Sequence, residues 1–398
     1  MSGKYVSLET VLEKCLTYAH PVDTEVIPVE NTHWRVLVRD IFADINIPDF
    51  SRSAVDGFTI HEKDLYNLQQ GEERELSIAG VIGAGDLGER SFTAGQAIKI
   101  MTGAMLPYGT AAVVKKEDIS ETGNNVLLDK PVIAGANIQN CGSHIKKGEL
   151  IAFAGQVLNF NELKLIASCG IASISVFKSP MVYIINTGSE LVMPGGNLQK
   201  GQIFTSNKTL YFSLLSASGC YPLSGEGPVI DKITSIAQEL QNGLKVSNLI
   251  IISGGTAEGQ FDLVQDAFKQ IGAEIIFAGL DLKPGQHTSA AVKDGVLLFN
   301  LPGNPGAGEL VFEVLIKPVL RKMRGIKTYH NNWFELSVNN LEQIKSPFRM
   351  MVKGCIEIKD GQLTARIMKK HEKQSGLINL IIDTQYNNGN RVKVLIPG

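Results

Sequence analysis

The chain has few cysteines, almost no net charge and no long hydrophobic run, and each absence excludes a class of protein. Its five cysteines are odd in number and widely spaced, without a Cys-x-x-Cys pair, so neither a disulfide framework nor a zinc site is indicated. A formal net charge of −2 provides no field that would gather nucleic acid or an anionic membrane. No run approaches the roughly 20 apolar residues of a membrane span. We therefore expect a soluble, unprocessed protein of the reducing cytoplasm.

The length and the hydrophobic pattern predict several domains. With 398 residues, of which 44% are hydrophobic, the chain exceeds what one core usually serves. Residues 7–19 have the period of an amphipathic helix, and 45–145 read as short strands divided by turns. From 180 to 325 strands and helices alternate, which is typical of an α/β layered domain. The last 70 residues return to β alternation, as in a small barrel or sandwich.

Four glycine-bearing loops in the α/β region each follow a short apolar, strand-like run. In a mostly parallel sheet, loops that leave the carboxyl ends of the strands open into a common crevice. Glycine lets backbone N–H groups approach a phosphate closely. The pattern therefore predicts one phosphate-binding site, and the acidic residues beside it indicate an accompanying metal. The loops are Thr187-Gly188-Ser189-Glu190, Ser253-Gly254-Gly255-Thr256, Lys283-Pro284-Gly285 and Leu301-Pro302-Gly303-Asn304-Pro305.

Seven segments, in order along nearly the whole chain, resemble the signature series of the MoeA family. These are the molybdopterin molybdenumtransferases, to which the gephyrin E domain also belongs. The segments are SAVDGF (53–58), IMTGAMLPYGTAAVVKKED (100–118), NTGSELVMPG (186–195), GQIFTSN (201–207), SGGTAEGQFD (253–262), KPG (283–285) and LPGNPGAG (301–308).

The resemblance implies a multidomain fold of α/β and β parts with four domains. The α/β domain is expected to be a Rossmann-like layered domain that binds the pterin, and the C-terminal domain a small β-barrel. In this numbering the expected domains are a discontinuous helical and linker domain over 1–45 and 146–178, a β-rich domain over 46–145, the molybdopterin-binding domain over 179–326, and the barrel domain over 327–398.

The resemblance also implies a reaction. Adenylylated molybdopterin and molybdate would be the substrates, and Mg²⁺ would be the metal present. The metal of molybdate would enter the dithiolene while AMP and the molybdenum cofactor are released. An elongated cytoplasmic homodimer is implied, together with an adenylyltransferase partner that supplies the pterin nucleotide.

Three carboxylates beside the predicted strand ends are candidate metal ligands. Glu190 follows the first loop, and Asp231 and Asp262 precede helical patterns. Aspartate often begins a helix as an N-cap, and the patterns predict one helix capped by Asn207 and another that begins at Asp231. Three carboxylates around phosphate-binding glycines nevertheless suit a hard divalent cation with oxygen ligands. We therefore favour Mg²⁺ bound by Glu190, Asp231 and Asp262.

The remaining candidate residues depend more strongly on the resemblance. Asp56 and Thr102 would be ordinary turn and strand-end residues, but the family match assigns them to the active site across the dimer. Lys283, which is expected to end a strand, would supply a point charge to a phosphate or to molybdate. The predicted pterin-binding residues are Gly188, Ser189, Ser253, Gly254, Gly255, Pro302, Gly303, Asn304, Pro305 and Ser375.

Five positions depart from the family pattern. A basic residue is replaced by Gln139, an active-site aspartate by His144, and a serine by Ala257; two further basic positions hold Gly279 and Gln286. Each charged hydrogen bond that is lost would weaken anion binding by roughly 1.5–3 kcal/mol. Three hypotheses therefore remain: an active insertase, a paralogue that binds a pterin or nucleotide and uses tungstate or a modified cofactor, and a non-catalytic dimeric scaffold.

Overall fold

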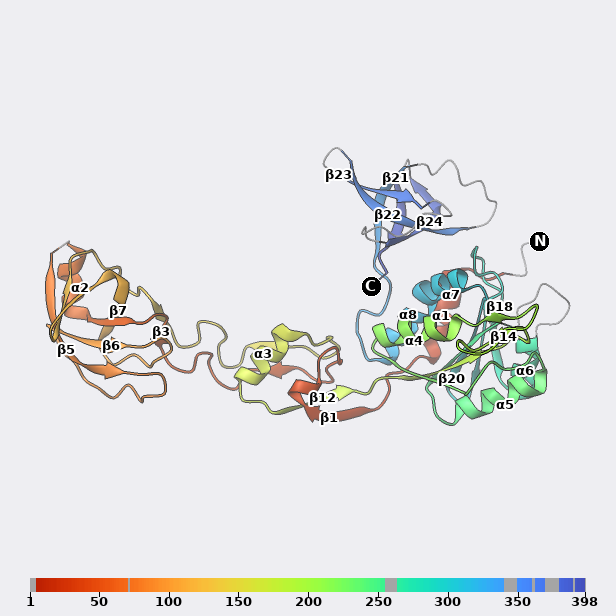
Figure 1. Ribbon diagram of the computed structural model, residues 1–398, viewed down its shortest axis with the longest axis horizontal. Coiled ribbons are helices and arrows are strands. Elements are labelled where there is room, and N and C mark those ends of the chain that lie inside the picture. The colour runs from red at the N-terminus through yellow and green to blue at the C-terminus, as the bar shows by residue number, and fades with distance from the viewer. Residues whose placement is uncertain are drawn as a thin grey trace. The chain divides into compact units, whose positions relative to one another are not determined.

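A computed structural model shows that the chain folds into two compact units (Figure 1). Unit 1 comprises residues 1–39, 154–158 and 174–398, and unit 2 comprises 40–153 and 159–173. The predicted division into four domains stays a prediction. No helix among the described residues is long and apolar enough to cross a membrane. The structure describes residues 5–70, 72–254, 263–339, 349–359, 362–368, 379–388 and 391–397.

Unit 1 is built on a six-stranded sheet in the order β16-β13-β17-β20-β19-β18. Only β19 runs antiparallel to its neighbours in this sheet, so the other five strands point the same way. β17, with the sequence LIIIS, is buried along its whole length, as expected for a strand covered on both faces. The strands are β13 (Met181–Asn186), β16 (Tyr221–Ser224), β17 (Leu249–Ser253), β18 (Glu274–Ala278), β19 (Ser289–Lys293) and β20 (Val296–Leu301).

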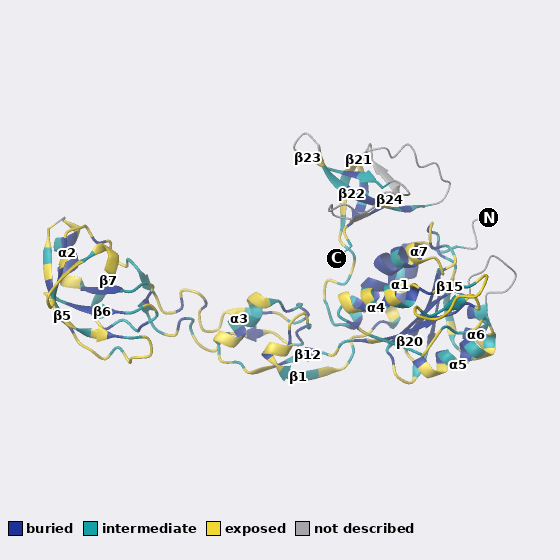
Figure 2. Ribbon diagram, viewed as in Figure 1, coloured by how far each residue is buried: buried dark blue, intermediate teal, exposed yellow. Residues whose placement is uncertain are grey.

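Helices cover both faces of this sheet. Figure 2 shows the strands of the sheet as mostly buried. Alternate residues of β17 enter two hydrophobic clusters: Ile251 packs in the cluster of α1, α4 and α7, whereas Ile252 packs in the cluster of α5 and α6. The predicted α/β layered domain is therefore confirmed. The helices are α1 (Leu8–Tyr18), α4 (Asn207–Ala217), α5 (Ile233–Leu244), α6 (Leu263–Gln270), α7 (Pro305–Val311) and α8 (Lys317–Met323), with a π-helical turn at Phe312–Ile316 between the last two.

The C-terminal strands of unit 1 form a closed barrel in the order β21-β23-β22-β24-β25, which confirms the predicted small barrel. Its core contains Val338, Ala365, Ile382, Val392 and Val394. The barrel strands are β21 (Trp333–Asn339), β22 (Met351–Lys359), β23 (Gln362–Ile367), β24 (Asn379–Asn388) and β25 (Arg391–Leu395). Outside the barrel, two short two-stranded sheets pair β1 (Thr24–Pro28) with β12 (Ser173–Phe177) and β14 (Leu191–Val192) with β15 (Ile203–Phe204).

Unit 2 contains a second six-stranded sheet, in the order β7-β4-β6-β5-β9-β8. Helix α3 (Phe160–Ser168) begins with a capping box in which Asn159 and Glu162 exchange hydrogen bonds with each other's backbone N–H groups. The other elements are β2 (Ile41–Phe42), β3 (Arg52–Ser53), β4 (Gly57–His61), α2 (Glu62–Gln69), β5 (Arg74–Ile82), β6 (Gln96–Ile100), β7 (Thr110–Lys115), β8 (Ser120–Thr122), β9 (Asn125–Leu128), β10 (Ile138–Gln139) and β11 (Leu150–Ala152).

Candidate functional site

The four predicted loops all leave the carboxyl ends of parallel strands in unit 1. They follow β13, β17, β18 and β20, which point the same way in the sheet. Because the carboxyl ends of parallel strands meet at one edge, these loops share the edge where α/β proteins bind ligands. The topology expected from the sequence is therefore present.

Two of these loops are in direct contact through glycine. The N–H of Thr187 donates to the carbonyl oxygen of Ser253 at 3.0 Å. A Cβ atom on Gly254 would lie only 2.0 Å from the Thr187 carbonyl oxygen, and Gly254 has a φ of 114°. Only glycine combines this conformation with such a close approach. Gly254 thus joins the loop after β17 to the loop after β13.

Asn207 holds a third loop against this pair. Its Nδ2 atom donates to the Ser253 hydroxyl at 2.5 Å and to the Gly303 carbonyl oxygen at 2.8 Å. Asn304 caps the following helix, because its side chain accepts from the N–H of Ala307 at 3.2 Å. The prediction that Asn207 caps α4 is wrong, since Ser206 is the N-cap residue and Asn207 bridges two loops instead.

Asp231 has a structural role in the first loop. Its carboxylate accepts from the Thr187 hydroxyl at 2.6 Å and from the N–H of Ser189 at 3.1 Å. Helix α5 begins at Ile233 with Lys232 as its N-cap residue, so the expectation that the helix begins at Asp231 is wrong. Asp231 therefore fixes the loop that carries Gly188 and Ser189.

Glu190 lies at the same loop and is exposed. Both of its carboxylate oxygens would be 2.9 Å from a Cβ atom on Gly188, so the side chain folds back over that glycine. No group of three or more acidic, histidine or cysteine side chains that could hold a metal occurs in the described part of the chain. The third predicted ligand, Asp262, lies outside the described residues, as do Gly255, Ala257 and Ser375.

Lys283 lies in the loop that follows β18, and the prediction that it ends a strand is wrong. β18 ends at Ala278, five positions earlier. The Lys283 N–H donates to the carbonyl oxygen of Arg349 at 2.9 Å, and its own carbonyl accepts from Met351 at 3.0 Å. The backbone of Lys283 thus pairs with the segment that enters β22, while its side chain is exposed. No hydrogen bond or ion pair joins this side chain to the three loops above among the described residues.

Asp56 and Thr102 form a separate pair in unit 2. One carboxylate oxygen of Asp56 accepts from the Thr102 N–H and from the Thr102 hydroxyl, both at 2.8 Å. These bonds, the backbone one foremost, hold the pKa of the Asp56 carboxyl below its usual value, and Lys116 at 3.8 Å adds a smaller attraction. The pair presents a fixed carboxylate at the surface of unit 2.

Replacing Thr102 with valine should raise the pKa of Asp56. The change removes the hydroxyl donor and keeps both the shape of the side chain and the backbone donor, so the pKa should rise without reaching its usual value. A titration of the Asp56 carboxyl by ¹³C NMR measures this directly. Thr102→Ser retains a hydroxyl and should titrate like the parent; an unchanged pKa in Thr102→Val would show that the hydroxyl does not stabilise the charge.

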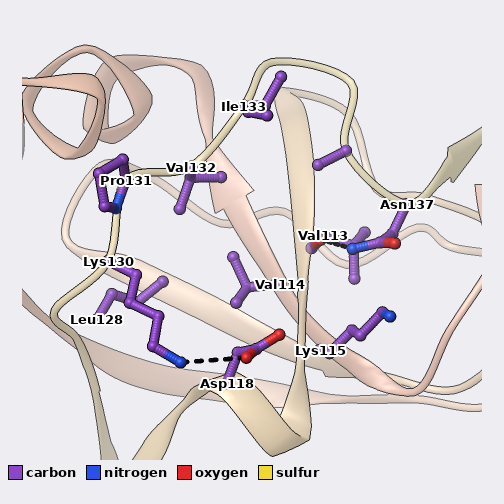
Figure 3. Close-up of a pocket in the computed structure, with 11 residues that line it drawn as sticks. Val113, Val114, Lys115, Asp118, Leu128, Lys130, Pro131, Val132, Ile133 and Asn137 are labelled. Atoms are coloured by element: carbon purple, nitrogen blue, oxygen red, sulfur yellow. Dashed lines mark hydrogen bonds and ion pairs between the residues drawn. The ribbon is translucent and has the colours of Figure 1, made fainter.

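A pocket of about 220 Å³ in unit 2 lies apart from these residues (Figure 3). Its floor is apolar and includes Val114, Leu128 and Val132, while Lys130 pairs with Asp118 at 3.2 Å across its rim. None of the predicted site residues lines it. The pocket and the sequence motifs therefore indicate different places in the protein.

Comparisons with known proteins cover both units. Residues 6–170 match the MoeA N-terminal region (domain I and II), and residues 183–322 match the probable molybdopterin binding domain. The molybdopterin molybdenumtransferase of Bacillus subtilis strain 168 is 30% identical over 347 residues, which is 86% of this chain and 80% of the relative. That of Staphylococcus aureus strain N315 is 30% identical over 320 residues, covering 80% and 76%.

A solved structure is also similar to this chain. The molybdopterin biosynthesis MoeA protein from Pyrococcus horikoshii OT3 superposes with a TM-score of 0.76 at 26% identity, covering 99% of this chain and 100% of that one. The fold, the ordered motifs and the relatives therefore agree. The chain belongs to the family of molybdopterin molybdenumtransferases, transferases of molybdenum cofactor biosynthesis.

Proposed function

We propose that this protein transfers molybdenum from molybdate into adenylylated molybdopterin and releases AMP. The observation that carries the proposal is the contact among three loops at the carboxyl edge of the unit 1 sheet. Gly254 lies against the Thr187 carbonyl, and Asn207 joins Ser253 to Gly303. Glycine-bearing loops gathered at the carboxyl edge of a parallel sheet suit the phosphates of a nucleotide. Gly188, Ser189, Pro302, Asn304 and Pro305 border the same contacts, and Gly255 and Ser375 are proposed from the resemblance alone.

Mg²⁺ fits the chemistry of the donors in this region. Glu190 has an exposed carboxylate with no hydrogen-bond partner among the described residues, and Asp231 keeps further lone pairs on oxygens that each accept one bond. Both are hard oxygen ligands of the kind that Mg²⁺ prefers. With Asp262 they would hold the ion, which would neutralise phosphate charge when bound. Lys283 would add a further positive charge from the neighbouring loop.

The proposed assembly is a cytoplasmic homodimer. In it, Asp56 and Thr102 of one subunit would contribute to the site on the other subunit, as the family resemblance implies. An adenylyltransferase partner would deliver the pterin nucleotide. Sedimentation as a monomer at micromolar concentration would contradict the dimer.

A second candidate function follows from the altered residues. Gln139 and His144 replace a basic and an acidic residue of the family pattern. A paralogue that binds the pterin nucleotide but uses tungstate or a modified cofactor would tolerate these two replacements. A non-catalytic scaffold would tolerate further replacements at the site. The Asp231 contacts favour a ligand site over a scaffold, because a scaffold needs no carboxylate fixed beside phosphate-binding loops.

The decisive experiment is reconstitution with purified components. The protein is mixed with adenylylated molybdopterin and Mg²⁺, and AMP release is followed before and after molybdate is added. The proposal expects release that requires both molybdate and Mg²⁺. Release only with tungstate would favour the paralogue, and nucleotide binding without AMP release in either case would favour a binding protein.

A further inference from the structure

Gln139 lies between a cation and an imidazole in unit 2. Its Oε1 atom accepts from Nε of Arg52 at 2.6 Å, and its Nε2 atom lies 2.6 Å from Nε2 of His144. The family pattern has a basic residue in place of Gln139 and an aspartate in place of His144. Three side chains, Arg52, Gln139 and His144, thus form a hydrogen-bonded chain at these two positions.

The chemistry of these groups fixes the direction of each bond. The Arg52 guanidinium only donates, so the amide oxygen of Gln139 must face it. The amide nitrogen of Gln139 must then donate to His144, whose Nε2 atom has to accept. His144 is therefore neutral in this arrangement, with its proton on Nδ1. The chain leaves one N–H of His144 and the terminal nitrogens of Arg52 available as donors.

The backbone holds these side chains in place. β3 and β10 pair antiparallel with Arg52 opposite Gln139, which puts the two side chains on the same face. Two bonds anchor the preceding turn: Asn137, with a φ of 55°, donates from its side chain to the Val113 carbonyl oxygen at 2.8 Å, as Figure 3 shows, and accepts from the N–H of Ala54 at 2.9 Å. The position of Gln139 is thus set by the fold as well as by its own contacts.

Arg52 forms no ion pair with the carboxylates that the structure describes. None of the ion pairs among the described residues includes it, whereas Lys116 pairs with Asp56 and Lys130 pairs with Asp118 in the same unit. Arg52 is only partly buried, so its terminal nitrogens can reach a ligand. A planar guanidinium with free N–H groups suits a tetrahedral oxyanion, to which it can donate two parallel bonds.

We propose that Arg52 and His144 bind a tetrahedral oxyanion, molybdate or phosphate, with Gln139 as the residue that positions both. Arg52 supplies the positive charge that position 139 lacks, and His144 adds a neutral donor where an aspartate would repel the anion. This assignment rests on the proposed function for the identity of the anion. On this proposal, the protein still binds the anion despite the changes at positions 139 and 144, because Arg52 and His144 provide the donors instead.

Calorimetric titration of the full-length protein with molybdate alone, and with phosphate alone, tests the site without the pterin. Arg52→Gln should weaken anion binding about tenfold or more, because it removes a charge-assisted interaction. His144→Asp should also weaken binding, and Gln139→Arg combined with His144→Asp should restore it to within a few-fold. Lys130→Gln, which removes a cation already paired with Asp118, is the matched control and should bind like the parent.

A second measurement reports on Gln139 without any ligand. Long-range ¹H–¹⁵N NMR should show His144 protonated on Nδ1 in the parent, and Gln139→Ala should abolish this preference. Parent protein that binds neither anion, Arg52→Gln with parental affinity, or an Nε2-protonated His144 would each overturn the proposal. If anion binding depends on Arg52 but no AMP is released, the proposed reaction is contradicted while the proposed anion site is still supported.

Discussion

Gly254→Ala is expected to abolish AMP release and to lower the free energy of unfolding by about 3 kcal/mol. The added Cβ would lie 2.0 Å from the Thr187 carbonyl oxygen, so the two loops must separate. The φ of 114° adds backbone strain that a side chain rarely tolerates. Chemical denaturation measures the stability, and equilibrium binding of the pterin nucleotide measures the loss of the site.

Gly303→Ala provides the matched control for this change. Its nearest neighbour would be the Cα of Gly254 at 3.6 Å, which is an ordinary contact. The fold should therefore tolerate this alanine far better than the one at 254. If both variants unfold at the same denaturant concentration as the parent, the contact between the loops does not stabilise the domain.

Asp231→Asn should reduce the rate of AMP release about 100-fold. The amide cannot accept both bonds that the carboxylate accepts from Thr187 and Ser189, so the loop shifts. A displacement of about 1 Å in a positioning loop can cost this much. A proposed Mg²⁺ ligand is lost as well. Affinity for the pterin nucleotide should change less, because one negative charge opposing the phosphates is removed.

Asp266→Asn separates this effect from a general change in charge. Asp266 pairs with Lys269 on the surface of α6, and such exposed pairs contribute little. Its rate and affinity should match the parent across a Mg²⁺ titration. Parental AMP release by Asp231→Asn would mean that the carboxylate neither fixes a catalytic loop nor binds a needed metal.

The layers of unit 1 could be predicted from the sequence because burial there leaves a strong pattern. The run LIIIS has no polar face, which indicates a strand covered on both sides, and the glycines after the strands mark the carboxyl edge at which we propose that the ligand binds. Lys283 was misplaced for the opposite reason. The apolar residues after Ala278 continue the strand-like pattern, yet Leu280 and Leu282 pack in the core from a loop.

The roles of Asn207 and Asp231 could not be predicted from local patterns. Both residue types favour helix starts, and both lie at or just before a helix. Their side chains instead bond across the fold, to Gly303 and to Thr187, and only the three-dimensional structure brings those partners near. The same holds for Arg52, whose bond to Gln139 joins positions 87 residues apart.

A crystal structure with adenylylated molybdopterin bound tests the central claim most directly. The account predicts that the phosphates lie at the carboxyl edge of the unit 1 sheet, against the loops that carry Gly188, Gly254 and Gly303. A nucleotide bound elsewhere, such as in the apolar pocket of unit 2 beside Val114, with these loops empty, would contradict it.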